Sequence, residues 1–180
     1  MTFWNAWPTS FAAEAVLAIY IFALVLAALS DLVSLRIPNW LTGMLALAFP
    51  IAALIAAHGA AGHGIDWLSH IEAGAVVFAG AAVLFACRLL GGGDVKLLAA
   101  MALWSGLPMV LPLLFLVAII GGAFALIVLG LRQPLVQASI LAVLRRAPAF
   151  LHSRMPIPYG IPIAIAGILM APHLPFLADF

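Results

Sequence analysis

Residues 95–131 read VKLLAAMALWSGLPMVLPLLFLVAIIGGAFALIVLGL, an apolar run in which Lys96 is the single charged residue. As one straight helix, this run would be about 55 Å long at ~1.5 Å per residue. The hydrocarbon core of a bilayer is only about 30 Å thick. We therefore predict a break near Gly106-Leu107-Pro108, between a short helix over 95–105 and a longer one over 109–131.

The rest of the chain is similarly apolar, since 67% of its 180 residues are hydrophobic and only 7% are charged. So few charged side chains cannot cover the surface of a soluble domain, and long uncharged runs indicate membrane spans. Residues 135–151 mix apolar residues with Arg145 and Arg146, which predicts an amphipathic helix on the membrane surface. We predict an all-α, polytopic transmembrane helical bundle that forms a single domain over 1–180, with about six spans at 11–30, 40–57, 71–90, 95–105, 109–131 and 157–177.

The positions of lysine and arginine predict how the bundle is oriented. Basic residues mark three connections, whereas the loop 58–70 has neither Lys nor Arg. Cytoplasmic loops carry an excess of these residues, so we place the three basic connections in the cytoplasm and both termini outside it. This orientation requires the run 95–131 to cross out and return. No basic cluster is dense enough to indicate a nucleic-acid partner. The basic residues are Arg36, then Arg88 and Lys96, then Arg132, Arg145, Arg146 and Arg154.

Two acidic residues, Asp31 and Asp94, fall on the predicted cytoplasmic side, each where a span meets a helix-breaking motif. A carboxylate at that depth is costly, which makes it a candidate for function. Two carboxyls at one depth can share a proton, so that one activates water while the other acts as an acid. The alternative is that both are hydrated interfacial residues. The sequence pattern does not show that the two carboxyl groups lie close together in space. The other acids fall near the outer face: Glu14, Asp66, Glu72 and Asp179.

Three motifs in order resemble those of the type IV prepilin peptidases, a family of GxGD membrane aspartic peptidases. Residues 91–97 read GGGDVKL, which is similar to the GxGD signature followed by a Lys-Leu helix. Asp31 precedes Arg36-Ile37-Pro38-Asn39, which resembles the family's first aspartate before an Ile-Pro-Asn turn. Residues 158–162, PYGIP, are more weakly similar to its C-terminal proline-glycine motif. The resemblance covers the chain from about residue 11 onward.

The resemblance implies an endopeptidase of the bacterial inner membrane that removes the leader peptide of prepilins and pseudopilins at the cytoplasmic face. It implies Asp31 and Asp94 as catalytic residues and no cofactor. The partners implied are a substrate with a single hydrophobic helix and a cytoplasmic leader, and membrane lipids. The chain resembles the short form associated with Tad or Flp pili, because it lacks the long form's insert with paired cysteines and has only Cys87. We do not expect N-methylation by this chain.

Around the two aspartates, further residues are candidates for positioning roles. Glycine backbone can adopt angles closed to other residues, and an extended peptide can approach it closely. We therefore expect Gly91, Gly92 and Gly93, with Pro38 and Asn39, to position the loops or the substrate; a simple turn is the alternative. Lys96 and Arg36 are predicted to act as interfacial anchors. The irregularly spaced His58, His63, Asp66 and His70 fall on the opposite side, and we predict no metal site.

Two other classes of protein fit parts of the pattern. A small proton-coupled transporter would use Asp31 and Asp94 as carrier sites, but it favours acids near the bilayer midplane and repeated halves. The acids here fall at the inner edge, and no internal repeat is evident. A non-catalytic assembly factor of a pilus or secretion system is the other alternative. It predicts that variants lacking either carboxylate still support assembly.

Overall fold

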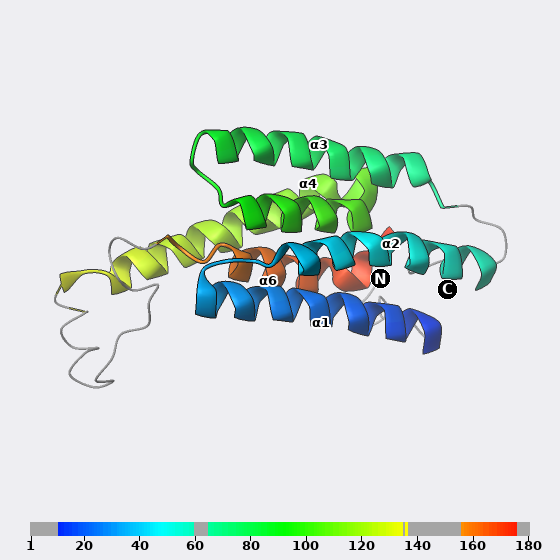
Figure 1. The fold of residues 1–180 in the computed structure, drawn as a ribbon, viewed down its shortest axis with the longest axis horizontal. Helices are drawn as coiled ribbons and strands as arrows, with labels where there is room; N and C mark the ends of the chain where they lie inside the picture. Colours follow the sequence, from blue (N-terminus) through cyan, green and yellow to red (C-terminus); the bar gives the residue numbers. More distant parts are fainter. Residues whose placement is uncertain (1–10, 60–64, 135, 137–155, 176–180) are drawn as a thin grey trace.

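A computed structural model describes residues 11–59, 65–134, 136 and 156–175 of the chain. These residues form helices connected by short turns, with no strand in the described ranges, so the predicted all-α fold is confirmed (Figure 1). The predicted surface helix over 135–151 lies outside the described residues, except for residue 136. The helices are α1 (Phe11–Ser34), α2 (Asn39–Gly59), α3 (Trp67–Ala86), α4 (Gly92–Leu131) and α6 (Gly160–Met170), followed by the 3-10 helix η3 (Ala171–His173).

Helix α4 is two helical arms that meet at Gly106. This residue has φ 63° and ψ 169°, which is not helical and is readily adopted only by glycine. The arms 92–105 and 107–131 run in opposite directions, so that the chain turns back on itself (Figure 1). The interruption lies where the length argument placed it.

Two side chains of α3 compensate for the helical hydrogen bond that is lost at this reversal. In an unbroken helix, the N–H of Leu107 would donate to the carbonyl of Leu103. Here the N–H of Leu107 donates to Ser69 Oγ at 3.0 Å. The carbonyl oxygen of Leu103 lies 2.7 Å from His70 Nδ1, which donates to it. Unpaired backbone groups are costly in a bilayer, so Ser69 and His70 stabilise the turn.

The helix ends differ from the predicted spans in ways that local contacts explain. Helix α1 continues to Ser34 rather than 30, which puts Asp31 inside its last turns. Helix α3 begins at Trp67 rather than 71, because Asp66 caps it by accepting a hydrogen bond from the N–H of Ser69 at 3.1 Å. Helix α6 is shorter than the predicted span 157–177, and η3 follows it directly.

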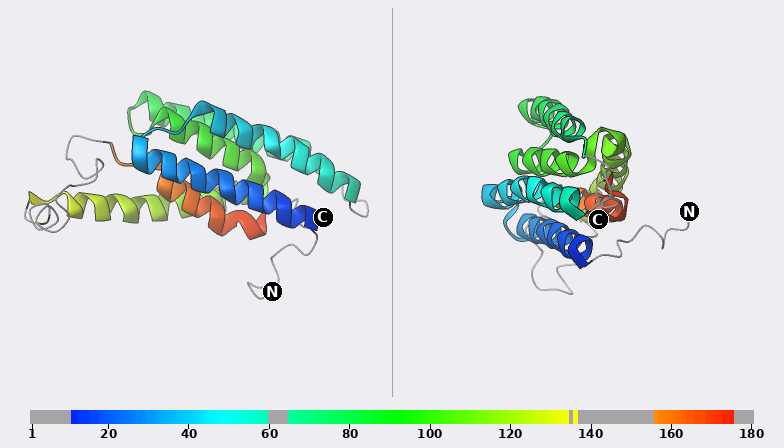
Figure 2. Two further views of the ribbon diagram at one scale, coloured as in Figure 1. Left: turned by 60° about the horizontal axis from the view of Figure 1, so that its bottom comes forward. Right: turned by 90° about the vertical axis from the view of Figure 1, so that its right-hand side faces the viewer.

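The helices alternate in direction, so their ends form two groups (Figures 1 and 2). The end of α1 and the starts of α2, α4 and α6 lie at one end of the bundle, on the left in Figure 1. The reversal at Gly106 lies at the other end. Between them, the buried Trp104 packs against Tyr20, with ring centroids 4.8 Å apart, and its Nε1 donates to the carbonyl of Leu45 at 2.8 Å.

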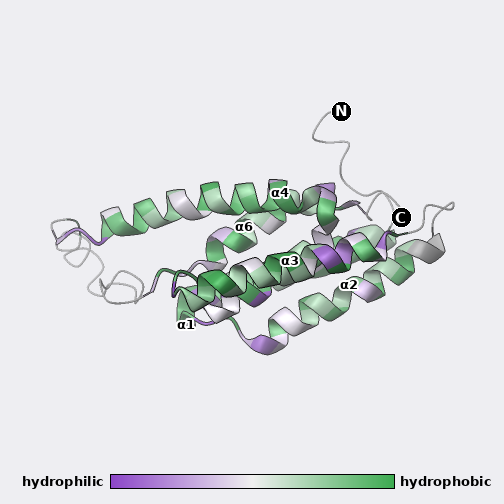
Figure 3. Ribbon diagram, turned by 90° about the horizontal axis from the view of Figure 1, so that it is seen from above, coloured by the Kyte–Doolittle hydropathy of each residue, from purple (hydrophilic) through white to green (hydrophobic). Residues whose placement is uncertain are grey.

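The described helices have the composition of membrane spans. Helices α1, α2 and α3 and the second arm of α4, 107–131, are each long and apolar enough to cross a bilayer, whereas the first arm, 92–105, and α6 with η3 are shorter. Apolar residues make up most of each helix, with a few hydrophilic stretches such as those on α3 and α2 (Figure 3). Large apolar side chains such as Phe22, Leu111 and Phe115 are more than half exposed, as expected for surfaces that face lipid. The chain is therefore a membrane protein.

Candidate active site

The turn after α1 is built by two serines and one strained residue. Leu35 has φ 53°, a left-handed conformation that ends the helix, and its N–H still donates to the carbonyl of Asp31 at 2.9 Å. Ser30 Oγ donates to the carbonyl of Arg36 at 2.9 Å. Ser34 Oγ, which has a single proton, lies 2.6 Å from the carbonyl of Ser30 and 3.1 Å from that of Arg36. These bonds hold the backbone that leads into the loop 36–39.

Asp31 is held from the opposite end of the chain. Its side chain is 5% exposed, and its Oδ2 accepts a hydrogen bond of 2.7 Å from the backbone N–H of Gly160. Gly160 is the first residue of α6, so Asp31 satisfies one of the N–H groups that a helix start leaves without a partner. A Cβ at Gly160 would lie 2.8 Å from Asp31 Oδ2 and 2.9 Å from Ile37 Cδ1. The site therefore requires glycine at this position.

Asp94 is held by the start of its own helix. It is the third residue of α4, 9% exposed, and its Oδ2 accepts a hydrogen bond of 3.3 Å from the N–H of Gly91. A carboxylate here interacts favourably with the positive end of the helix dipole. Each aspartate thus uses Oδ2 to bind a backbone N–H at a helix start, which fixes the orientation of its carboxyl group.

The two aspartates, which are 63 residues apart in the sequence, line one cavity of about 530 Å³. The loop after α1 and the glycine run form the rest of its wall. These segments touch, because a Cβ at Gly93 would lie 3.0 Å from Ile37 Cβ and 3.3 Å from Ile37 N. A Cβ at Gly92 would come no closer than 3.4 Å to any atom, at Phe85. The lining residues are Asp31, Ser34, Leu35, Arg36, Ile37, Pro38, Asn39, Gly91, Gly92, Gly93 and Asp94.

This arrangement gives the carboxyl pair one fixed oxygen and one available oxygen each. Within the described residues, the hydrogen bonds from Gly160 and Gly91 are the ones made by the two carboxyl groups, and both go to Oδ2. Oδ1 of each aspartate is therefore available to water or to a substrate in the cavity. Two carboxyls that share a proton can supply a general base and a general acid together.

The predicted accessory residues occupy different places around the cavity. Pro38, Asn39 and the glycine run line it, and Arg36 lines it with an exposed side chain. Lys96 has a specific protein partner, because its Nζ donates to Asn39 Oδ1 at 2.8 Å and so connects α4 to the start of α2. Elsewhere, His70 and Asp66 serve the reversal and the cap of α3, and His63 lies outside the described residues.

Three residues of this site were not identified from the sequence. Gly160 was contained in the quoted PYGIP motif, but nothing in that motif links it to Asp31. Ser30 and Ser34 could not be recognised from the sequence, because a serine pair near a helix end is common. The carbonyl groups that accept their hydrogen bonds are determined by the geometry of the turn.

One comparison with known proteins is positive. The family model described as the type IV leader peptidase family matches residues 18–126. The matched region contains Asp31, Asp94 and the glycine run, and it ends before Gly160. No curated protein and no solved structure matches the chain at a significant level.

Proposed function

Since the chain belongs to the type IV leader peptidase family, we propose that it is an aspartic endopeptidase with Asp31 and Asp94 as its catalytic pair. Family membership makes the chain a peptidase and implies a prepilin as substrate in general. The aspartic mechanism is supported by one observation above all: both buried carboxyls line the same cavity, each with one oxygen bound to a backbone N–H.

In the proposed reaction the pair holds one proton. The ionised carboxyl takes a proton from water as the water oxygen attacks the scissile carbonyl carbon. The protonated carboxyl donates a hydrogen bond to the carbonyl oxygen. When the C–N bond breaks, the leaving nitrogen takes a proton from the pair, and one water is consumed for each bond cut. The N–H groups of Gly160 and Gly91 keep both carboxyls oriented throughout.

The cavity suits an extended peptide. Its volume of about 530 Å³ lies within the range of ~300–1,000 Å³ that is typical of ligand pockets. A helical peptide shields its carbonyl groups, so the bond to be cut must be in an extended conformation. Gly91, Gly92 and Gly93 lack side chains that would keep such a backbone away from Asp94.

The distribution of charge supports a site at the cytoplasmic face of a bacterial inner membrane. Arg36 lines the cavity, Arg88 and Lys96 lie on either side of the glycine run in the sequence, and Arg132 follows the last residue of α4. An excess of basic residues favours the cytoplasmic side. We further propose the short, Flp-type form acting on Flp-type prepilins and pseudopilins. A chain with Cys87 as its one cysteine cannot supply the paired cysteines of the long form.

The test is removal of the leader from a Flp-type prepilin co-expressed with wild type, Asp31→Asn or Asp94→Asn. Asparagine keeps an oxygen that can accept the N–H of Gly160 or Gly91, so the fold is retained while proton transfer is lost. We expect both variants to leave the precursor at full length. Glu72→Gln is the matched control, because Glu72 is an exposed acid on α3 away from the cavity.

The result separates the candidate functions. If both asparagine variants process the precursor like wild type at equal membrane levels, the catalytic assignment is wrong. A proton-coupled transporter or a non-catalytic assembly factor would then be the better interpretation. If wild type and Glu72→Gln cleave while both asparagine variants do not, the pair is required for cleavage.

A further inference from the structure

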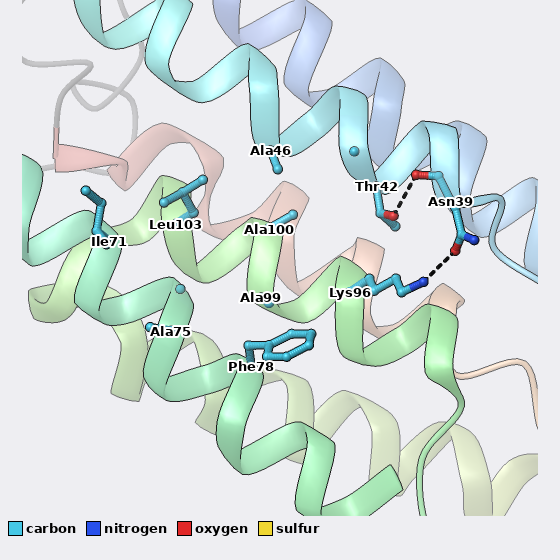
Figure 4. Close-up of a pocket in the computed structure, with 12 residues that line it drawn as sticks. Asn39, Thr42, Ala46, Ile71, Ala75, Phe78, Lys96, Ala99, Ala100 and Leu103 are labelled. Carbon is cyan, nitrogen blue, oxygen red and sulfur yellow. Dashed lines mark hydrogen bonds between the residues drawn. The ribbon is translucent and has the colours of Figure 1, made fainter.

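A second cavity lies beside the catalytic one, between α2, α3 and the arm 92–105 (Figure 4). We propose that this groove receives an apolar helical segment of the substrate next to the bond that is cut. The inference rests on the proposed function, because it concerns the substrate of the same site. Below, the residues lining this cavity are called the groove.

The groove has a volume of about 500 Å³ and is mostly apolar. Asn39, Thr42 and Lys96 lie together at one end, where Lys96 bonds to Asn39, and Ile71 and Leu103 lie toward the other (Figure 4). Small side chains on a helix surface allow another helix to approach closely. Half of the lining consists of such residues: Gly43, Ala46, Gly74, Ala75, Ala99 and Ala100.

The groove adjoins the catalytic cavity, because Asn39 lines both. The hydrogen bonds from Lys96 to Asn39 Oδ1 and from Thr42 to the Asn39 carbonyl hold this residue at the junction. A polypeptide whose scissile bond lies between Asp31 and Asp94 reaches the groove by passing Asn39. This adjacency favours the substrate over an unrelated occupant.

The lining determines the conformation of what enters. Away from Asn39, Thr42 and Lys96, the groove offers only apolar side chains. In lipid, backbone N–H and carbonyl groups must be satisfied within their own segment, which a helix achieves. The peptide is thus extended at the carboxyl pair and helical beyond Asn39. Phe78 and Ile71, which are 49% and 56% exposed, provide contact area for its apolar side chains.

Gly43 provides the test, because a Cβ built there has no atom within 4 Å. A larger side chain at this position starts from an open Cβ position and extends into the groove. Gly80 on α3 is the matched control: it is equally unobstructed but does not line the groove. We therefore compare Gly43→Phe with Gly80→Phe. Thermal unfolding of both purified variants checks that each retains the wild-type fold.

Two substrates are used: the full Flp-type prepilin in detergent, and a soluble peptide that covers only the cut site. For Gly43→Phe we expect kcat/KM on the prepilin to fall about ten-fold more than kcat/KM on the peptide. Gly80→Phe should leave both values near those of wild type. Equal losses on both substrates, or no loss for Gly43→Phe, would overturn the groove assignment. Failure of wild type on both would overturn the proposed function, and the groove assignment with it.

A second measurement identifies the occupant directly. A photoreactive benzophenone residue is placed at Gly43 or at Gly80 in the Asp94→Asn background, which retains uncut prepilin. We expect crosslinks to prepilin from position 43 and none from position 80. Crosslinks from position 43 only to lipid, or only to a second copy of this chain, would overturn the proposal even if the kinetic effect were present.

Discussion

At both ends of the bundle, side chains bind backbone groups that a helix end or break leaves without a helical partner. The two ends differ in what else those side chains can bind. At the Gly106 reversal, Ser69 and His70 pair with the N–H and the carbonyl that the broken helix releases. At the other end, Asp31 and Asp94 pair with N–H groups at the starts of α6 and α4. Within the described residues, Oδ1 of each carboxyl keeps no such bond. The first end is therefore suited to a structural role and the second to chemistry.

The strongest test of this contrast is Gly160→Ala. The added Cβ would lie 2.8–2.9 Å from atoms of Asp31 and Ile37, so the carboxyl group must move. Because misplacement by about 1 Å can cost ~100-fold in rate, we expect kcat for leader removal to fall by about two orders of magnitude. Gly122→Ala is the control, since a Cβ there meets no atom within 4 Å. An unchanged kcat for Gly160→Ala would show that the contact with α6 does not orient Asp31.

The opposite pattern is expected for His70→Ala. Loss of the imidazole leaves the carbonyl of Leu103 without this donor in an apolar environment, which costs about 1–3 kcal/mol. We expect a lower unfolding temperature in detergent, with kcat of the folded fraction close to wild type. Calorimetry together with cleavage kinetics measures both. A large fall in kcat at unchanged stability would mean that the reversal end contributes to chemistry after all.

The glycine run offers a finer test within the catalytic end. Alanine at Gly93 would put a Cβ 3.0 Å from Ile37, whereas alanine at Gly92 makes only ordinary contacts. We expect Gly93→Ala to lower kcat/KM about ten-fold, by separating the two loops that form the cavity, and Gly92→Ala to change it little. Kinetics on the same prepilin compare the pair. Equal effects would argue that the run is a simple turn.

The smallest effect is expected for Ser30→Ala. This change removes the hydroxyl bond of 2.9 Å to the carbonyl of Arg36, a loss of about 0.5–1.5 kcal/mol in stability. Ser34 Oγ remains at the turn, 2.6 Å from the carbonyl of residue 30 and 3.1 Å from that of Arg36, so activity should fall only slightly. Chemical denaturation of Ser30→Ala and of the Ser30→Ala/Ser34→Ala pair checks this. If the double variant is no less stable than the single one, the serines do not support the turn.

Much of the fold could be predicted because its causes are local. The run 95–131 is too long for one crossing, and Gly106 has the backbone freedom that a reversal needs. The candidate aspartates could also be selected, since each adjoins a helix-breaking motif in a connection that carries Lys or Arg. The helix ends were less predictable. The early start of α3 depends on a cap by Asp66, and the shortness of α6 on the 3-10 turn that follows it.

The sequence by itself determined a membrane protein of apolar helices, the place of its break, and two candidate carboxylates, because composition and chain length act through local rules. Only the tertiary structure decided that Asp31 is held by Gly160, 129 residues away, and that Asp94 shares its cavity. It also decided that Lys96 binds Asn39. Such contacts depend on how the helices pack against one another. The pattern of apolar residues within a single helix does not specify which other helix it will pack against.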